Sequence, residues 1–155
     1  MGRFPEGKDR GGEGMQDSKQ REENEKKKEY LRSYQKALRR EKEILDEIQR
    51  LRMDKMFPSI AGDGMPHGSS QNDLSDYIVL IDEQIELLKT ERLERAKIRS
   101  GIERRIREMK DDDEQSVLRS RYIKGLQWTA VADELGYCLR RIHEIHSEAL
   151  KHFEK

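Results

Sequence analysis

Apolar residues recur at alternating intervals of three and four along two long stretches of the chain, the spacing of an amphipathic helix. In the first stretch they stand at Leu31, Tyr34, Leu38, Leu45 and Ile48. Glu41 fills the position between Leu38 and Leu45. This stripe predicts a helix from about Glu22 to about Met56, because Pro58 disfavours helical geometry at the residue before it.

The second stretch is longer and more regular. Eight of its eleven stripe positions are apolar, and the eleven are Leu74, Ile78, Ile81, Ile85, Leu88, Arg92, Arg95, Arg99, Ile102, Ile106 and Met109. The spacing is that of a coiled coil, although three arginines weaken its middle. Glycine, proline, serine and asparagine gather in residues 58–73, which predicts a loop. A loop of this length lets the two helices fold back as an antiparallel hairpin, while pairing with a second chain stays open.

A different pattern follows the second stretch. The acidic run at residues 111–114 suits the start of a helix, whose dipole favours negative charge there, and Gly125 suits its end. Residues 128–147 then match a helix-turn-helix, with small Ala132 where the helices cross and Gly136 in the turn. Its structural positions are predicted to be Val131, Ala132, Leu135, Gly136, Tyr137, Ile142 and Ile145.

If the isoleucines face inward, the opposite side of the second helix, about residues 138–152, faces outward. The N-terminal turns of a recognition helix meet base edges in the major groove. The predicted base-reading residues are Leu139, Arg140, His143, Glu144 and Ser147. The predicted phosphate contacts are Lys124, Gln127, Thr129, Arg141 and Lys151.

Composition narrows the class of protein. Charged residues make up 41% of the 155 positions and hydrophobic ones 33%, which suits long helices that bury one narrow stripe. The formal net charge is zero, so any nucleic-acid surface must be local, and residues 117–155 carry only seven basic against five acidic side chains. We therefore expect an all-α protein with residues 1–21 as a disordered tail, 22–110 as a helical hairpin or coiled coil, and 111–155 as a DNA-binding domain. Met15 is an alternative start to Met1.

The chain also lacks patterns that would indicate other classes. No apolar run approaches the ~20 residues of a membrane span, and no signal-peptide pattern is present. The single cysteine, Cys138, excludes an internal disulfide and fits a reducing, cytoplasmic compartment.

Metal binding and catalysis find little support in the residues. His143 and His146 have workable ligand spacing, but two further ligands are missing, so we expect no metal and no cofactor. His143 is expected to face DNA and His146 to cover the domain surface. Cys138 has no organised base nearby, and no phosphate-binding loop or Ser-His-Asp pattern occurs, so we do not expect an enzyme.

The residues of the C-terminal part carry a family resemblance. RYI at 121–123, the W-x-x-V-A-x-x-L-G-Y run at 128–137 and RRIHEIHSEAL at 140–150 resemble region 4 of bacterial sigma factors, which reads the −35 promoter element. Together with YLRSYQKAL at 30–38 and the loop GDGMPHGSS, they are more similar to small phage and prophage proteins of unknown function related to phage late-gene regulators. The resemblance implies promoter DNA as a partner, with host RNA polymerase beside it. Cys138, Leu139 and Gln127 depart from the residues usual in region 4.

Three functions remain open from the sequence. The first is a DNA-binding transcriptional regulator of phage or prophage origin, acting in the bacterial cytoplasm as a homo-oligomer joined through Leu74–Met109. The second is a DNA-packaging component similar to a small terminase subunit. The third is an RNA-polymerase or other protein-interaction module without DNA specificity of its own.

Overall fold

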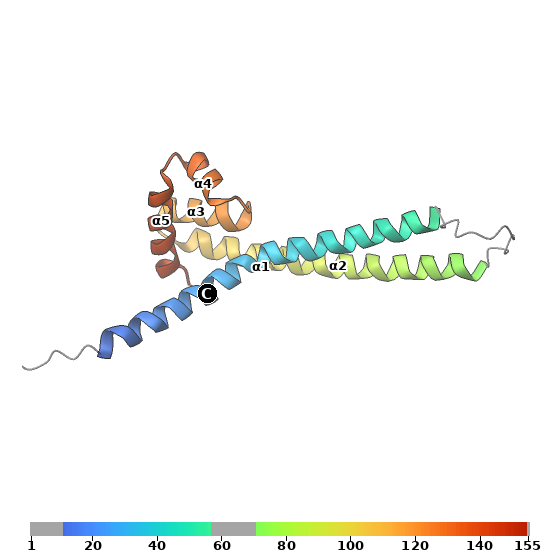
Figure 1. Cartoon of the computed structure of the whole chain (residues 1–155), viewed down its shortest axis with the longest axis horizontal. Coiled ribbons are helices and arrows are strands. Elements are labelled where there is room, and N and C mark those ends of the chain that lie inside the picture. Colours follow the sequence, from blue (N-terminus) through green and yellow to red (C-terminus); the bar gives the residue numbers. More distant parts are fainter. Residues whose placement is uncertain (1–10, 57–70, 155) are drawn as a thin grey trace, which may run out of the picture. The chain divides into compact units, whose positions relative to one another are not determined.

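Every regular element is a helix in the computed structural model, which describes residues 11–56 and 71–154 (Figure 1). The elements in chain order are α1 (Gly11–Met56), α2 (Gln71–Glu108), α3 (Asp112–Leu118), the π-helix η1 (Arg119–Ile123), α4 (Trp128–Leu135) and α5 (Leu139–His152). The predicted all-α class is confirmed. Most of the predicted loop 58–73 lies outside the described residues, although α2 already includes its last three. None of the described helices combines the length and the apolar character needed to cross a bilayer.

The first helix begins earlier than expected. α1 starts at Gly11, eleven residues before the predicted start at Glu22, so the predicted tail 1–21 is partly helical. Ion pairs one turn apart support this polar segment: Asp17–Arg21 at 3.2 Å and Glu23–Lys27 at 3.2 Å. Residues 1–10 lie outside the described part of the chain. The glycine-rich composition of the tail predicted disorder. The spacing of its charged residues from Asp17 onward favours a helix instead.

The chain divides into two compact units, which cut across the two long helices. One unit, here the terminal unit, comprises Met1–Arg32 and Glu103–Lys155, and the other, the paired-helix unit, comprises Ser33–Ile102. The N-terminal part of α1 therefore belongs with the C-terminal helices. The predicted division placed residues 22–32 with the hairpin and the residues before them in a tail.

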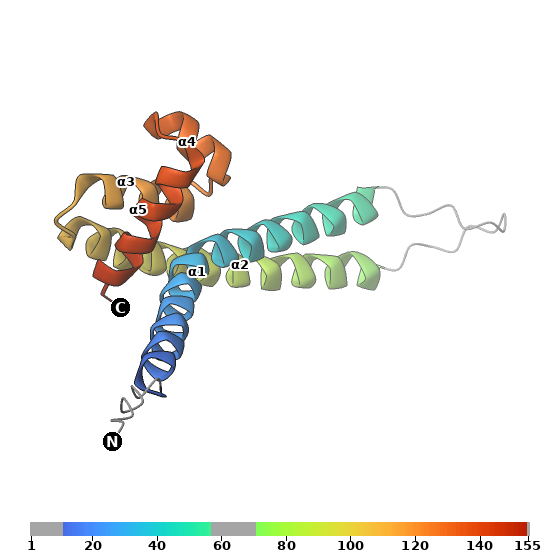
Figure 2. The same ribbon diagram turned by 60° about the vertical axis from the view of Figure 1, so that its left-hand side comes forward.

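Within the paired-helix unit, α1 and α2 run side by side in opposite directions (Figures 1 and 2). Ile44 and Ile48 form a small buried cluster with Leu88, against which Ile85 packs. The predicted stripe of α1 is wrong at one position, because Ile44 is buried and Leu45 is 40% exposed. Both residues are apolar neighbours, and only the rotation of α1 against α2 decides which one faces inward.

The arginines that interrupt the α2 stripe have partners on α1. Glu41 is buried, and its carboxylate forms ion pairs with Arg92, at 2.9 Å, and with Arg95. On the other flank of the pair, Arg40 reaches Glu91 at 3.0 Å. A buried carboxylate requires such partners, so Glu41 and the arginines belong to one ionic layer within the apolar seam.

The terminal unit has a core of its own. Val117 of α3, Val131 and Ala132 of α4, and Ile142 and Ile145 of α5 form one buried cluster. Asp111 caps α3 by accepting a hydrogen bond of 2.9 Å from the backbone N–H of Glu114, so the acidic run does begin a helix, as predicted. The core fixes how α4 and α5 cross and thus which side of α5 is exposed.

Candidate nucleic-acid interface

A tight turn joins α4 to α5. Gly136 has a φ of +71°, and its backbone N–H closes α4 on the carbonyl of Ala132, while extended Cys138 begins α5. Glycine reaches this left-handed conformation without a side-chain clash. Val131, Ala132, Ile142 and Ile145 are buried, and Leu135 packs against them, as predicted from the sequence.

Tyr137 departs from the prediction. It was expected to point inward, yet it is 37% exposed, and its hydroxyl donates a hydrogen bond of 2.9 Å to Asp113 Oδ2 at the start of α3. This bond to a carboxylate raises the pKa of the Tyr137 phenol. Tyr137 thus keeps its hydroxyl at the protein surface and links the turn to α3 from outside the core.

The structure brings the predicted base-reading residues onto one exposed side of α5. These are Leu139, Arg140, His143, Glu144 and Ser147. Arg140 Nε lies 3.2 Å from Glu144 Oε1, and the Ser147 hydroxyl donates to the His143 carbonyl at 2.9 Å. The face is thus polar, solvent-exposed and partly engaged in contacts within its own helix.

The predicted phosphate contacts are also exposed, but three of them are already paired with carboxylates. Lys124 forms an ion pair with Glu134, Lys151 with Glu148 at 2.6 Å, and Arg141 with Glu144 at 3.6 Å. The Lys151 and Arg141 pairs span three residues on one helix and could have been predicted from spacing. The Lys124 pair joins the end of η1 to α4, which only the tertiary fold brings together.

Gln127 and Thr129, the remaining two predicted phosphate contacts, lie at the start of α4. Gln127 is the residue before the first turn and its side chain makes no capping hydrogen bond, and both residues are exposed. Their polar side chains therefore reach solvent at the start of this helix. This helix start therefore offers uncharged donors beside the α5 face.

His146 lies in a different environment from the one predicted. It is 7% exposed, and its Nε2 lies 2.9 Å from the Tyr122 hydroxyl. Burial, followed by the nearby charges of Lys28, His143, Arg121 and Arg32, lowers the pKa of His146 to about 4. The expectation that His146 covers the surface is wrong, because α5 turns the Ile142–His146–Ala149 side toward the core.

Trp128 and Arg121 entered the sequence analysis only as part of the family resemblance, with no predicted contact, yet they connect the core with the exposed face. The Trp128 ring lies 4.9 Å from that of His143 and 4.8 Å from that of His146. The Arg121 guanidinium lies 4.7 Å from the Trp128 ring centroid and donates to the Leu126 carbonyl at 2.6 Å. The only tryptophan of the chain therefore reports on the environment of an exposed α5 residue.

The C-terminal end of α5 is held by the N-terminal part of α1. Lys27 is buried, and its ammonium donates to the Leu150 carbonyl at 2.9 Å and lies 3.2 Å from Glu23. A cation at a helix C-terminus satisfies carbonyls that have no partner within the helix. The Tyr30 ring packs at a tilt against that of Phe153, just beyond the end of α5, with the centroids 6.2 Å apart. Lys27 stands in a lysine run, so its sequence gave no sign of this contact.

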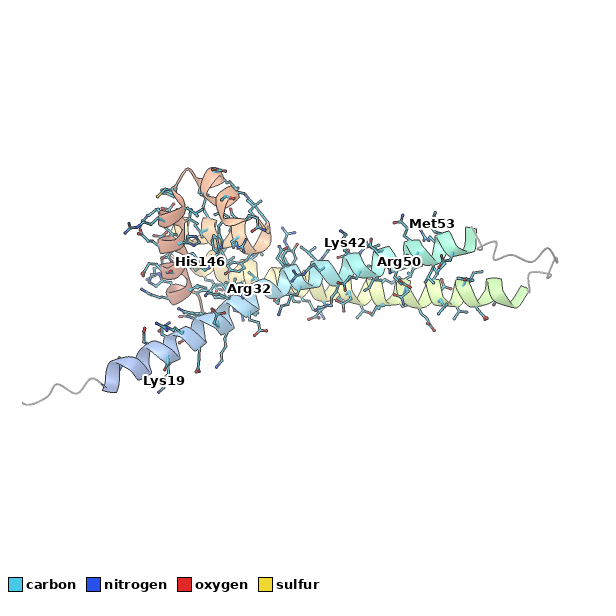
Figure 3. The ribbon with its side chains drawn as sticks, viewed as in Figure 1. Lys19, Arg32, Lys42, Arg50, Met53 and His146 are labelled. Atoms are coloured by element: carbon cyan, nitrogen blue, oxygen red, sulfur yellow. The ribbon has the colours of Figure 1, made fainter. Side chains whose placement is uncertain are left out.

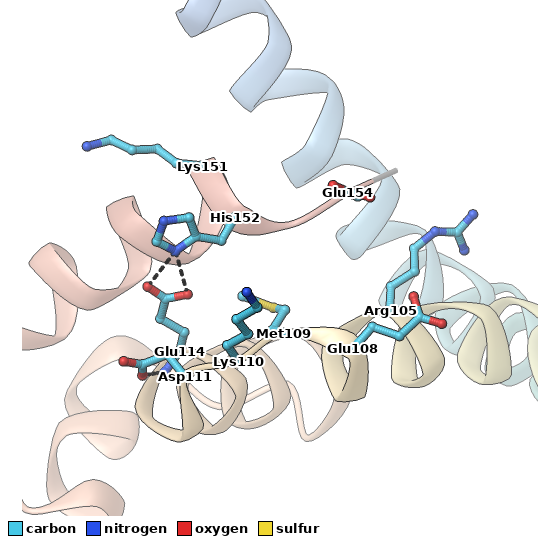
Figure 4. Close-up of a pocket in the computed structure, with 9 residues that line it drawn as sticks. All are labelled: Arg105, Glu108, Met109, Lys110, Asp111, Glu114, Lys151, His152 and Glu154. Carbon is cyan, nitrogen blue, oxygen red and sulfur yellow. Dashed lines mark hydrogen bonds and ion pairs between the residues drawn. The ribbon is translucent and has the colours of Figure 1, made fainter.

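A cavity of about 620 Å³ opens in the terminal unit between the end of α2, the start of α3 and the end of α5 (Figure 4). Its lining is mostly charged, with both signs present. The buried carboxylate of Glu114 already contacts His152, whose Nδ1 lies 2.9 Å from both of its oxygens. Within the described residues, no group of three or more histidine, cysteine, aspartate or glutamate side chains is placed to hold a metal ion.

Comparison of the chain with protein-family models, with curated proteins and with solved structures gave no match.

Proposed function

We propose that the protein is a DNA-binding transcriptional regulator whose α4 and α5 act as a helix-turn-helix, with α5 in the major groove. The observation that carries this proposal is the division of α5 into a buried apolar side and an exposed side of polar residues in its first three turns. The resemblance to sigma region 4 and to small phage proteins supports the same orientation. The protein would then act in the bacterial cytoplasm at a promoter, beside host RNA polymerase.

Each exposed α5 residue suits a base edge. The Arg140 guanidinium matches the two acceptors of guanine, Glu144 accepts from cytosine N4, and Leu139 contacts a thymine methyl group. Arg140 and Glu144 contact each other in the free protein, so binding exchanges this ion pair for contacts with bases. A wrong base would leave a base contact unmade, and such a mismatch costs about 1–3 kcal/mol.

Affinity for DNA of any sequence should be low, because three of the predicted phosphate contacts are already paired with carboxylates. Lys124, Arg141 and Lys151 each have a carboxylate partner that a phosphate group must displace. When a phosphate displaces a carboxylate from a basic side chain, little additional charge is neutralised. Neutralisation of phosphates supplies most of the sequence-independent binding free energy. The proposed regulator therefore depends on base contacts more than on a general basic surface.

The test is selection of bound sequences from random double-stranded DNA, followed by titration of the selected site into the full chain. We expect Trp128 fluorescence to change on binding, because its ring contacts His143 on the α5 face. Arg140→Ala should weaken the selected site by about tenfold or more and relax specificity at one base pair. Arg104→Ala, at an exposed arginine of α2, is the matched control and should leave the preferred sequence unchanged.

Enrichment of no sequence, or an unaltered preferred site in Arg140→Ala, would contradict the proposal. The internal ion pairs also favour one alternative, a protein-interaction module in which the same α5 face contacts RNA polymerase or another protein. That module predicts no salt-sensitive DNA binding, together with loss of the protein contact in Arg140→Ala. The same titrations, repeated at several salt concentrations, separate the two functions.

A further inference from the structure

The exposed apolar residues of this protein are concentrated in the paired-helix unit. Among the described residues, seven of the nine exposed large hydrophobic side chains lie there: Leu45, Met53, Ile78, Val79, Leu80, Leu87 and Leu93. Met53, for example, is 48% exposed and projects from α1 on the side away from α2 (Figure 3). Exposed apolar side chains gathered in one unit of a protein typically mark a surface that another molecule covers.

Part of this surface forms a second stripe along α2. Ser75, Ile78, Asp82, Ile85, Lys89, Leu93 and Ala96 recur at intervals of three and four, and all but half-buried Ile85 are exposed. The stripe lies roughly a quarter turn around α2 from the residues that face α1, such as Leu88. Faces at this angle are the ones that helices in a four-helix bundle present to their two neighbours.

Leu45 of α1 lies beside the α2 stripe, so the exposed apolar surface extends over both helices. Buried Glu41 reaches out of the seam to the half-exposed Arg92, so this ion pair marks one flank of the helix pair. Leu45 follows Glu41 by four residues, and Ile85 precedes Arg92 by seven, so each lies on the same side of its helix as the ion pair. Leu45 and Ile85 therefore border the same flank.

The α2 stripe is complementary to itself when two copies run antiparallel. With the two-fold axis near Ile85, residues whose numbers add to 171 lie opposite each other: 78 with 93, 82 with 89, and 75 with 96. Ile78 then packs on Leu93, small Ser75 lies against small Ala96, and the Asp82 carboxylate meets the Lys89 ammonium. Because the axis repeats every contact, the dimer has two such attractive ion pairs.

We propose that a second copy of this chain covers the flank of the paired-helix unit, with α2 packed antiparallel on α2 about Ile85 and Asp82 paired with Lys89 of the other copy. Lys89 would exchange its contact with Glu86, 2.6 Å away on the same helix, for this pair. This surface shares Ile78 and Ile85 with the predicted Leu74–Met109 stripe, but Leu88 of that stripe is buried against α1. The inference does not depend on DNA binding.

Charge exchange tests the proposal on the full chain without DNA, by sedimentation or light scattering over a wide range of protein concentrations. The wild-type chain should be a dimer. Asp82→Lys and Lys89→Asp should each weaken dimerisation by at least about tenfold, because like charges then oppose each other twice. The double variant Asp82→Lys/Lys89→Asp should restore the dimer.

A mixture of the two single variants makes the test sharper. One chain then carries lysine and the other aspartate at both positions, so we expect a heterodimer from two chains that are separately monomeric. Glu83→Lys, the same charge change one residue outside the stripe, is the control and should dimerise like the wild type. Helical content by circular dichroism shows that each variant folds.

A monomeric wild-type chain, an undiminished dimer in the single variants, or a mixture that stays monomeric would each overturn the proposed interface. If the chain selected no DNA sequence, the proposed interface would not be affected, because the dimerisation measurements contain no DNA. Conversely, Arg140→Ala should dimerise like the wild-type chain whether or not α5 binds DNA.

Discussion

His146 is a buried ring that the fold keeps neutral. Its pKa in the folded protein is about 4, below the ordinary value of 6.5, because burial and nearby cations disfavour the protonated form. Between these two values the unfolded chain binds a proton that the folded chain does not. Stability of the terminal unit is therefore complete above pH 6.5 and falls as the pH is lowered toward 4, by up to about 3 kcal/mol from this group.

The measurement is urea unfolding across this pH range, followed by Trp128 fluorescence. His146→Gln can keep a hydrogen bond to Tyr122 without titrating, and it should remove most of the loss between pH 6.5 and 5, where few carboxylates change charge. An equally steep pH dependence in that variant would exclude His146 as the origin.

Lys27 stabilises the end of α5 through a charged hydrogen bond to the Leu150 carbonyl. Lys27→Met preserves the apolar stem but leaves that carbonyl without its partner. We expect the free energy of unfolding of the terminal unit to fall by about 1–3 kcal/mol. Lys26→Met, at an exposed neighbour on α1, is the control and should change it by less than about 0.5 kcal/mol.

At the scale of elements, the α4–α5 turn depends on one backbone conformation. Gly136 has a φ of +71°, and a Cβ built there meets no atom within 4 Å, so substitution strains only the backbone. Gly136→Ala should destabilise the terminal unit by about 1–2 kcal/mol, and Gly136→Asn by less, because asparagine tolerates the left-handed region better. Chemical unfolding of the three chains measures this order; equal stability of all three would contradict it.

The two long helices illustrate a different property of elements. The apolar spacing of α1 defines a helix, yet neighbouring Ile44 and Leu45 satisfy the same pattern almost equally. The rotation of α1 against α2 decides between them, and it buries Ile44 with Ile48 and Leu88. Leu45 is then left on the flank that the proposed second copy covers.

At the scale of the whole molecule, the two units should respond differently to protein concentration. If the paired-helix unit dimerises as proposed, mass action raises its melting temperature with concentration. The terminal unit has its own core of five buried residues and should respond less. We expect the far-UV dichroism transition, to which α1 and α2 contribute most, to rise with concentration more than the Trp128 fluorescence transition. Asp82→Lys should abolish the difference, whereas Glu83→Lys should not.

Local patterns in the sequence predicted much of the terminal unit. The helical class, the cap at Asp111 and the turn at Gly136 follow from residue spacing and backbone preference, which act over a few residues. The burial of Val131, Ala132, Ile142 and Ile145 also followed, because the turn and the apolar spacing together orient both helices. The exposed α5 face was predicted with them, as the side opposite the isoleucines.

Contacts between residues distant in sequence decided the rest. The Tyr122 hydroxyl and the Trp128 ring make His146 a core residue, Asp113 holds Tyr137 outside, and Lys27 reaches an α5 carbonyl 123 positions away. Spacing along one helix cannot show such contacts, since each depends on how another element packs against it. The sequence by itself determined which segments are helical and which side of each is apolar. Only the tertiary structure decided which apolar sides cover one another and which charges are already paired, because both depend on packing between segments.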